Sequence, residues 1–223
     1  MTTTPALSNH QPTRRALFKT TASLGATASA AMLGACATAQ SSKGAASKPI
    51  FDVPAITVPI VGSASSFPVR RIYCIGRNYR AHAIEMGSNP DREPPFFFQK
   101  PTDAIQYVAP NTVADHPYPT LTKNYHYEVE LVACLNKGSG GKKIAIEQAL
   151  DLVYGYALGL DMTRRDLQRA LGDEKKPWEI GKSFDQSAPI GPIHPVSSIG
   201  HIGKAAIWLK VNGATKQNAN LSQ

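Results

Sequence analysis

Two glutamates inside an apolar run place the strongest constraint on how this chain can fold. The run spans Tyr125 to Leu135, and Glu128 and Glu130 interrupt it two residues apart. In an extended strand successive side chains point to opposite faces, so both glutamates lie on one face. Like charges on one face are costly unless they are solvated, protonated or neutralised by a cation. The pattern therefore indicates either a solvated strand face with two surface glutamates or a site for a positive ion.

A third carboxylate, Asp161, closes the apolar run from Tyr154 to Leu160, which we expect to form another strand. Oxygen-only ligands suit a hard divalent ion such as Mg, Mn or Ca. Thr163 follows closely and can cap a helix on which Arg165 and Gln168 share a face. An acid between a strand end and a helix start is typical of binding sites, and it is also an ordinary position for a capping aspartate.

A short helix is expected from Asn78 to Met86, with His82 and Glu85 three residues apart on one face. A carboxylate beside an imidazole orients the ring and raises its basicity, as a general base that takes a proton from water requires. An exposed polar pair is the common alternative. Lys182 has apolar neighbours on both sides in the sequence, and a surface lysine is its ordinary interpretation.

The composition fits one domain of ordinary size, because 223 residues suffice to bury a core. The net charge is +8, and Arg14, Arg15 and Lys19 carry three of these charges in a stretch of 36 residues without an acid. The rest holds 21 basic and 16 acidic residues. Since no basic run is interleaved with aromatics, this excess fits small anionic substrates and not nucleic acid.

Three cysteines give no disulfide framework, and we expect Cys74 and Cys134 to be small core residues.

Residues 1–39 resemble an export signal. Arg14 and Arg15 precede a stretch of small and apolar residues that runs without a charge to Ser42, which is typical of a twin-arginine signal. This stretch is too weakly apolar for a membrane span. We therefore expect export by the twin-arginine route to a periplasmic or lipid-anchored location. A disordered N-terminal tail on a cytoplasmic protein is the alternative.

The end of the signal offers two processing sites. Cys36 ends a segment that resembles a lipobox, whose cysteine would carry a lipid anchor. Cleavage after Ala39 by an ordinary signal peptidase is the alternative. Residues 40–67 are expected to be linker and N-terminal extension, and residues 68–223 the folded domain.

Strand patterns dominate the body of the chain. Strands are expected at Val69–Ile75, Phe96–Lys100 and Ala205–Val211, the last followed by an Asn212-Gly213 hairpin turn and a return strand. Helical periodicity is found at Ile146–Val153, a loop is expected at Asn111–Thr122 and a turn at Ala188–Pro192. Because strands and helices do not alternate regularly, the fold class is expected to be α+β with a mixed, rolled sheet.

Five segments occur in an order and spacing that resemble the fumarylacetoacetate hydrolase superfamily: GRNYRAHAIEMG, PPFFFQKPTDAI, YHYEVELV, GYALGLDMTRRDLQ and WEIGKSFDQSAPIGP. The resemblance runs from about Pro68 to Gln223 and is closest to the bacterial members that hydrolyse fumarylpyruvate in gentisate breakdown. It implies the strand-dominated, mixed β-roll of this catalytic domain and a homodimer.

The resemblance also implies a metal centre. Its ligands would be Glu128, Glu130 and Asp161. Mg is the ion of first choice, with Mn or Ca as alternatives, because three carboxylates suit all of them.

The other functional residues of the family also have counterparts in this chain. The resemblance implies that His82 and Glu85 activate a water molecule and that Lys182 stabilises negative charge. Arg165 and Gln168 would hold the carboxylate end of a small anionic 2-oxo acid substrate.

The implied reaction is hydrolysis of the carbon-carbon bond of a 2,4-diketo acid, with 3-fumarylpyruvate and water giving fumarate and pyruvate. Decarboxylation of oxaloacetate or a related 2-oxo diacid, or hydrolysis of a wider range of acylpyruvates, is the alternative.

We also expect the chain to lack the last strands of the family fold, since no Thr-Gly-Thr-Pro loop is found before Gln223. An inactive exported fragment is therefore a further alternative.

Overall fold

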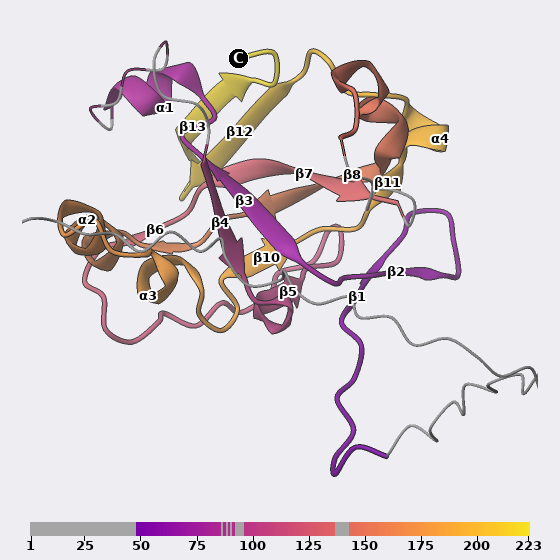
Figure 1. Cartoon of the computed structure of the whole chain (residues 1–223), viewed down its shortest axis with the longest axis horizontal. Coiled ribbons are helices and arrows are strands. Elements are labelled where there is room, and N and C mark those ends of the chain that lie inside the picture. The colour runs from indigo at the N-terminus through magenta and orange to yellow at the C-terminus, as the bar shows by residue number, and fades with distance from the viewer. Residues whose placement is uncertain (1–47, 86, 88, 90, 92–95, 137–142) are drawn as a thin grey trace, which may run out of the picture. The chain divides into compact units, whose positions relative to one another are not determined.

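The computed structural model describes residues 48–85, 87, 89, 91, 96–136 and 143–223 (Figure 1). All the described helices and strands belong to one compact unit, Phe51–Gln223. The twin-arginine pair and Cys36 lie outside the described residues. Within the described ranges, no helix is both long and apolar enough to cross a membrane.

The secondary structure consists mainly of strands. The strands are β1 (Thr57–Pro59), β2 (Ser66–Pro68), β3 (Ile72–Gly76), β4 (Phe96–Lys100), β5 (Ile105–Tyr107), β6 (Tyr125–His126), β7 (Val129–Leu135), β8 (Val153–Leu160), β9 (Thr163–Arg164), β10 (Ala188–Ile190), β11 (His194–Pro195), β12 (Ala206–Val211) and β13 (Ala214–Asn220). The α-helices are α1 (Arg80–Glu85), α2 (Arg165–Asp173), α3 (Glu179–Lys182) and α4 (Val196–Ile199). Short 3-10 turns are η1 (Thr102–Ala104), η3 (Ile146–Gln148) and η4 (Leu150–Leu152).

A five-stranded mixed sheet organises the fold, with β8 as its main strand. The order is β11-β8-β10-β5, and β7 also pairs with β8. The β10–β5 pair is parallel, whereas β7, β10 and β11 run antiparallel to β8. Four two-stranded pairs surround this sheet: β1–β2, β3–β4, β6–β9 and β12–β13. The α+β class with a mixed, strand-dominated sheet is thus confirmed.

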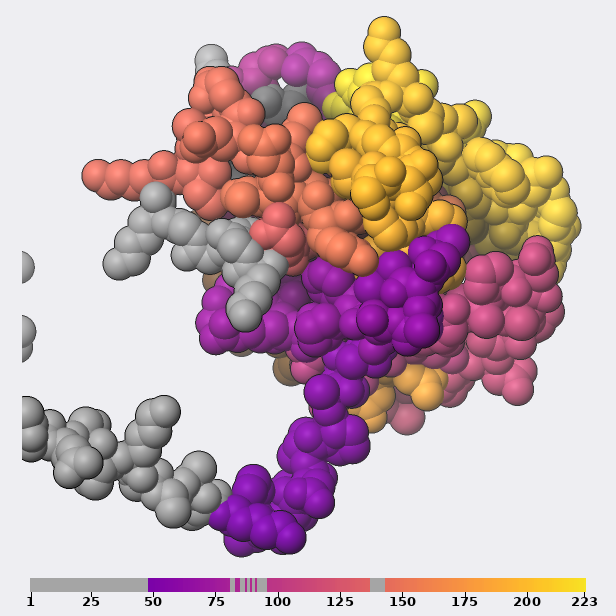
Figure 2. Space-filling view, turned by 90° about the vertical axis from the view of Figure 1, so that its right-hand side faces the viewer, coloured from indigo at the N-terminus to yellow at the C-terminus, as the bar shows by residue number. Residues whose placement is uncertain are grey.

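The apolar core joins the first strands to the main sheet. Val58, Ile60, Cys134, Ala157 and Ile193 form one buried cluster. Ile60 and Ile193 are bridged in parallel, and Figure 2 shows the indigo early segment lying beside the golden later segment. Strand β1 falls within the residues assigned above to the N-terminal extension, so part of that extension packs against the domain; the domain boundary itself stays a prediction.

Several local predictions are confirmed. Strand β4 spans the predicted residues, and β12 and β13 form the predicted hairpin around Asn212-Gly213. The segment Asn111–Thr122 contains neither helix nor strand. Cys74 and Cys134 are both buried free cysteines.

Other local predictions are wrong because pairing in the sheet overrides local pattern. The helix expected at Ile146–Val153 is replaced by η3 and η4, since Val153 already begins β8. The turn expected at Ala188–Pro192 begins with strand β10, which pairs with β5 and β8. The run from Tyr125 to Leu135 is divided, because β6 pairs with β9 whereas β7 pairs with β8.

The close pairing of β8 and β11 depends on Gly155. A Cβ atom at this position would lie 2.5 Å from the backbone oxygen of His194 and 2.9 Å from Cγ2 of Ile193. We therefore predict that Gly155→Ala lowers the free energy of unfolding by about 1–3 kcal/mol, the usual cost of overpacking. Urea denaturation measures this loss. Gly203→Ala is the matched control, because nothing lies within 4 Å of its added Cβ, and equal stability of the two variants would contradict the prediction.

Candidate metal centre

Antiparallel pairing of β7 with β8 brings the three predicted ligands together. Val129 lies opposite Leu160, so the start of β7 meets the end of β8. The Asp161 amide donates to the Glu128 carbonyl oxygen at 2.9 Å across this pair. Glu128, Glu130 and Asp161 each offer a carboxylate oxygen, and these atoms all lie within 4.8 Å of one another. The three side chains converge as alternation requires, and their role as metal ligands stays a prediction.

The glutamates do not lie on a solvated strand face. Further along the same face of β7, Cys134 is buried and Val132 packs against the core cluster. On the opposite face Leu135 is 53% exposed. The face that carries the two carboxylates is therefore the inner face of β7, and the solvated alternative is wrong.

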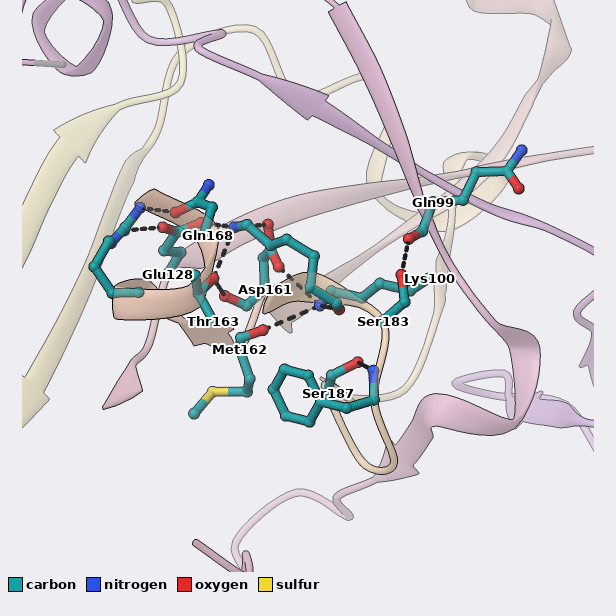
Figure 3. A network of polar contacts seen from close by, with 12 residues as sticks. Gln99, Lys100, Glu128, Asp161, Met162, Thr163, Gln168, Ser183 and Ser187 are labelled. Atoms are coloured by element: carbon teal, nitrogen blue, oxygen red, sulfur yellow. Dashed lines mark hydrogen bonds and ion pairs between the residues drawn. The ribbon is translucent and has the colours of Figure 1, made fainter. Parts of the chain in front are cut away.

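Lys182 lies among the carboxylates and is only 2% exposed, so its interpretation as a surface lysine is wrong. Its Nζ is 2.8 Å from Glu128 Oε2, 2.7 Å from Asp161 Oδ2 and 2.7 Å from Thr163 Oγ1. Figure 3 shows this network of polar contacts. Thr163 belongs to β9 and no side chain caps α2, so the predicted cap is also wrong. The threonine instead hydrogen-bonds to the lysine and to the Asp161 carbonyl oxygen.

A second buried cation, Lys100, is a site residue that the sequence analysis missed. It is 4% exposed, and its Nζ lies 2.9 Å from Asp161 Oδ1. It also donates to the Met162 carbonyl oxygen at 3.1 Å and to the Lys182 carbonyl oxygen. Alternation along β4 places Lys100 on the face of Phe96 and Phe98, but the sequence does not show that this face is the inner one, because Phe97 on the other face is also apolar.

Arg165 and Gln168 lie in the first turns of α2 and are each 4% exposed. The Arg165 guanidinium donates to Gln168 Oε1 at 2.5 Å and to Glu128 Oε1. Its Nε donates to His126 Nδ1 at 3.4 Å. The predicted shared face of the two residues is confirmed, and the arginine connects this face directly to the carboxylate cluster.

The surroundings shift the pKa values of the two glutamates in opposite directions. Burial raises the pKa of Glu128, but Lys182 and Arg165 outweigh burial and hold it below its ordinary value. Burial lowers the pKa of Lys182, yet Asp161 and Glu128 hold it above the ordinary lysine value. Burial and the neighbouring charges of Asp161 and Glu128 raise the pKa of Glu130 to about 8. Glu130 is therefore the carboxyl of the cluster that holds a proton at neutral pH.

The donor set fits a divalent metal ion. Three carboxylate oxygens suit a hard cation, and the raised pKa of Glu130 shows that this position favours added positive charge.

His82 and Glu85 lie on α1, but their side chains are outside the described part of the structure. In the segment after α1, Asp91 forms an exposed ion pair with Arg80 at 2.6 Å.

The fold and the site define an α+β domain with a carboxylate cluster suited to metal-dependent catalysis. Residues 71–223 match the family model described as fumarylacetoacetate (FAA) hydrolase C-terminal, and the chain belongs to this family.

Three similar proteins illustrate the range of the family. The crystal structure of fumarylpyruvate hydrolase from Pseudomonas aeruginosa in complex with Mn2+ and pyruvate is 53% identical, with a TM-score of 0.75, covering 78% of this chain and 74% of that one. The fumarylpyruvate hydrolase of a Ralstonia species is 42% identical over 141 residues, covering 62% of this chain and 69% of that protein. The mitochondrial oxaloacetate decarboxylase of Dictyostelium discoideum is 36% identical over 156 residues, covering 69% and 68%.

Removing the Lys100 charge should destabilise the domain. Lys100→Met keeps the length of the side chain but leaves Asp161 Oδ1 without its ion-pair partner and two carbonyl oxygens without their buried donor. Breaking a buried ion pair typically costs about 3–5 kcal/mol, so we predict a loss of about 3 kcal/mol in the free energy of unfolding. Urea denaturation measures it, with exposed Lys204→Met as the control. A loss no larger than that of the control would contradict the assignment.

Metal affinity should depend on pH through Glu130. Below a pKa of about 8 the carboxyl is protonated, so metal binding must release that proton. We predict that the Mn2+ dissociation constant falls by up to about tenfold per pH unit from pH 6 to pH 8 and then levels off. Calorimetric titration at several pH values measures this. Glu130→Gln should bind weakly with little dependence on pH, whereas the exposed control Glu147→Gln should keep the wild-type profile; a flat wild-type profile would contradict the prediction.

Proposed function

We propose that this chain is a divalent-metal-dependent hydrolase that cleaves 3-fumarylpyruvate, a 2,4-diketo acid, with water to give fumarate and pyruvate. The observation that carries the proposal is the cluster of Glu128, Glu130 and Asp161 in a chain similar to a fumarylpyruvate hydrolase solved with Mn2+ and pyruvate. We propose Mg as the ion in the cell, with Mn or Ca as alternatives.

The three carboxylates would hold the ion, and their surroundings fit that task. A bound ion supplies Lewis-acid stabilisation of the negative charge that develops as the pyruvate part leaves. Lys182 and Lys100 form ion pairs with Asp161, and Lys182 and Arg165 hold the pKa of Glu128 below its ordinary value. Glu130, whose pKa is raised to about 8, must give up a proton before it can act as a ligand.

The anionic substrate requires cationic and polar groups beside the ion. Arg165 and Gln168 project from one face of α2 next to Glu128 and offer a guanidinium and an amide to a substrate carboxylate. Lys182, hydrogen-bonded to two of the proposed ligands, stabilises charge on the oxygen atoms of the substrate. Positioning by such groups aligns the scissile bond with the attacking water.

Water is the nucleophile in this proposal. His82, oriented by Glu85, takes a proton from the water, and the resulting hydroxide attacks the carbonyl carbon of the fumaryl group. The carbon-carbon bond then breaks, its electron pair passes to the pyruvate fragment as an enolate, and this fragment takes up a proton. The products are fumarate and pyruvate in equal amounts.

A direct assay tests the activity. Purified protein with Mn2+ should remove the ultraviolet absorbance of 3-fumarylpyruvate and release one pyruvate per fumarate. Glu128→Ala should lower kcat/KM by more than about 100-fold, because even residues around metal ligands contribute 10- to 100-fold. The exposed control Lys204→Ala should retain full activity. Unchanged turnover by Glu128→Ala, or no turnover by the wild type, would contradict the proposal.

Oxaloacetate decarboxylation is the second candidate, favoured by the similarity to the Dictyostelium enzyme. This reaction needs stabilisation of an enolate but no attacking water. His82→Ala should therefore retain decarboxylation and lose hydrolysis if one site supports both. A broader acylpyruvate hydrolase would be distinguished by comparing kcat/KM for acetylpyruvate and fumarylpyruvate.

We also propose export through the twin-arginine route and assembly as a homodimer. The support for export is the Arg14-Arg15 pair, the uncharged stretch after it and the lipobox-like segment at Cys36. Replacing both arginines by lysine should leave the protein in the cytoplasm on cell fractionation, and Cys36→Ser should abolish lipid labelling. Equal periplasmic yield of the double-lysine variant would contradict the proposed route.

A further inference from the structure

Strand β7 pairs with β8 along one edge. Because every second backbone amide of β7 points away from β8, these amides need other hydrogen-bond partners. Val129 lies opposite Leu160, and the Asp161 amide donates to the Glu128 carbonyl oxygen at 2.9 Å. In an antiparallel ladder, this arrangement makes Val129 and Leu160 a non-hydrogen-bonded pair. The Val129 amide, between the two glutamates, therefore points away from β8.

A side chain from the C-terminal hairpin binds this amide. Gln217 lies on β13, and its Oε1 accepts a hydrogen bond from the Val129 amide at 2.9 Å in a half-buried contact. The hairpin of β12 and β13 contacts β7, and Figure 1 shows it beside the start of that strand. Residues 88 positions apart in the sequence are thus joined at the carboxylate cluster.

The peptide unit between Glu128 and Val129 is consequently held on both sides. The amide of Asp161, a proposed ligand itself, binds its carbonyl oxygen, and Gln217 binds its N–H. This unit sets the backbone direction from which the Glu128 and Glu130 side chains leave. A rotation of the unit would separate carboxylate oxygens that now lie within 4.8 Å of one another.

We propose that Gln217 is a positioning residue of the metal centre, which fixes the spacing of Glu128 and Glu130 through the Val129 amide. This proposal rests on the metal-dependent function proposed above. Groups that orient metal ligands without touching the metal typically contribute 10- to 100-fold to its affinity. The C-terminal hairpin is thereby part of the site, although it provides no ligand.

Replacement of the acceptor tests this role. Gln217→Met keeps the length of the side chain and removes the oxygen, so the Mn2+ dissociation constant should rise about tenfold, as measured by the electron paramagnetic resonance signal of free Mn2+. Gln217→Glu keeps an oxygen at the same position and should retain most of the affinity. The control is Thr215→Met, an exposed site on the same strand, which should bind Mn2+ like the wild type. Melting in EDTA should be similar for Gln217→Met and the control.

The outcomes separate this proposal from the proposed function. If the wild type binds no Mn2+, the metal-dependent function fails and the role of Gln217 fails with it. If the wild type binds Mn2+ and Gln217→Met binds it equally well, only the role of Gln217 is overturned. Hydrogen exchange of the wild-type Val129 amide gives a test that needs no variant. Slow exchange, like that of Glu130 in the ladder, is expected, and fast exchange would overturn the proposal.

Discussion

The bonds of the Lys182 ammonium are the interaction on which the carboxylate cluster depends. This group contacts Glu128, Asp161 and Thr163 at once, and so joins the end of α3 to the residue before β7 and to the stretch that follows β8. Lys182 lies at the end of α3. This helix approaches α2 so closely that a Cβ atom on Gly181 would be 2.9 Å from the backbone nitrogen of Gln168. The glycine before the lysine thus allows the contact that brings the face of α2 with Arg165 and Gln168 close to the buried ammonium.

The cations compensate the carboxylates unequally, and this inequality gives the site its chemical character. Asp161 is paired with both buried lysines, and Glu128 is paired with Lys182 and Arg165. In the described part of the chain, no hydrogen bond or ion pair to the Glu130 carboxylate is found, and its pKa is raised to about 8. A divalent ion would supply the positive charge that this side of the cluster lacks.

Local sequence pattern was sufficient to predict that the three carboxylates come together, but not to predict which side chains surround them. Alternation predicts that Glu128 and Glu130 share a face, and the end of an apolar run marks Asp161. The burial of Lys182 could not be derived in the same way, because apolar neighbours in the sequence do not show where a lysine side chain lies, and lysines are usually exposed. Its position depends on pairing between strands and helices distant in the sequence, as does the role of Thr163, which hydrogen-bonds to the lysine instead of capping α2.

The strand predictions show the same contrast between local sequence pattern and pairing of distant segments. The hairpin around Asn212-Gly213 is encoded by its turn residues, whereas β10 forms at a Pro-Gly-rich segment because β5 and β8 both pair with it. Resemblance to a family identified the chemistry more specifically than any single pattern could. The structure adds Lys100 and Gln217, which lie far away in the sequence. Lys100 forms an ion pair with Asp161, and Gln217 accepts a hydrogen bond from the Val129 amide between the two glutamates.

The proposed function requires that Glu128, Glu130 and Asp161 together bind one divalent ion. Anomalous diffraction at the manganese absorption edge, from crystals grown with Mn2+, would locate this ion. We expect one strong anomalous peak in coordination contact with an oxygen atom of each of the three carboxylates. A peak bound by other residues, or no peak while Lys182 still bridges Glu128 and Asp161, would contradict it.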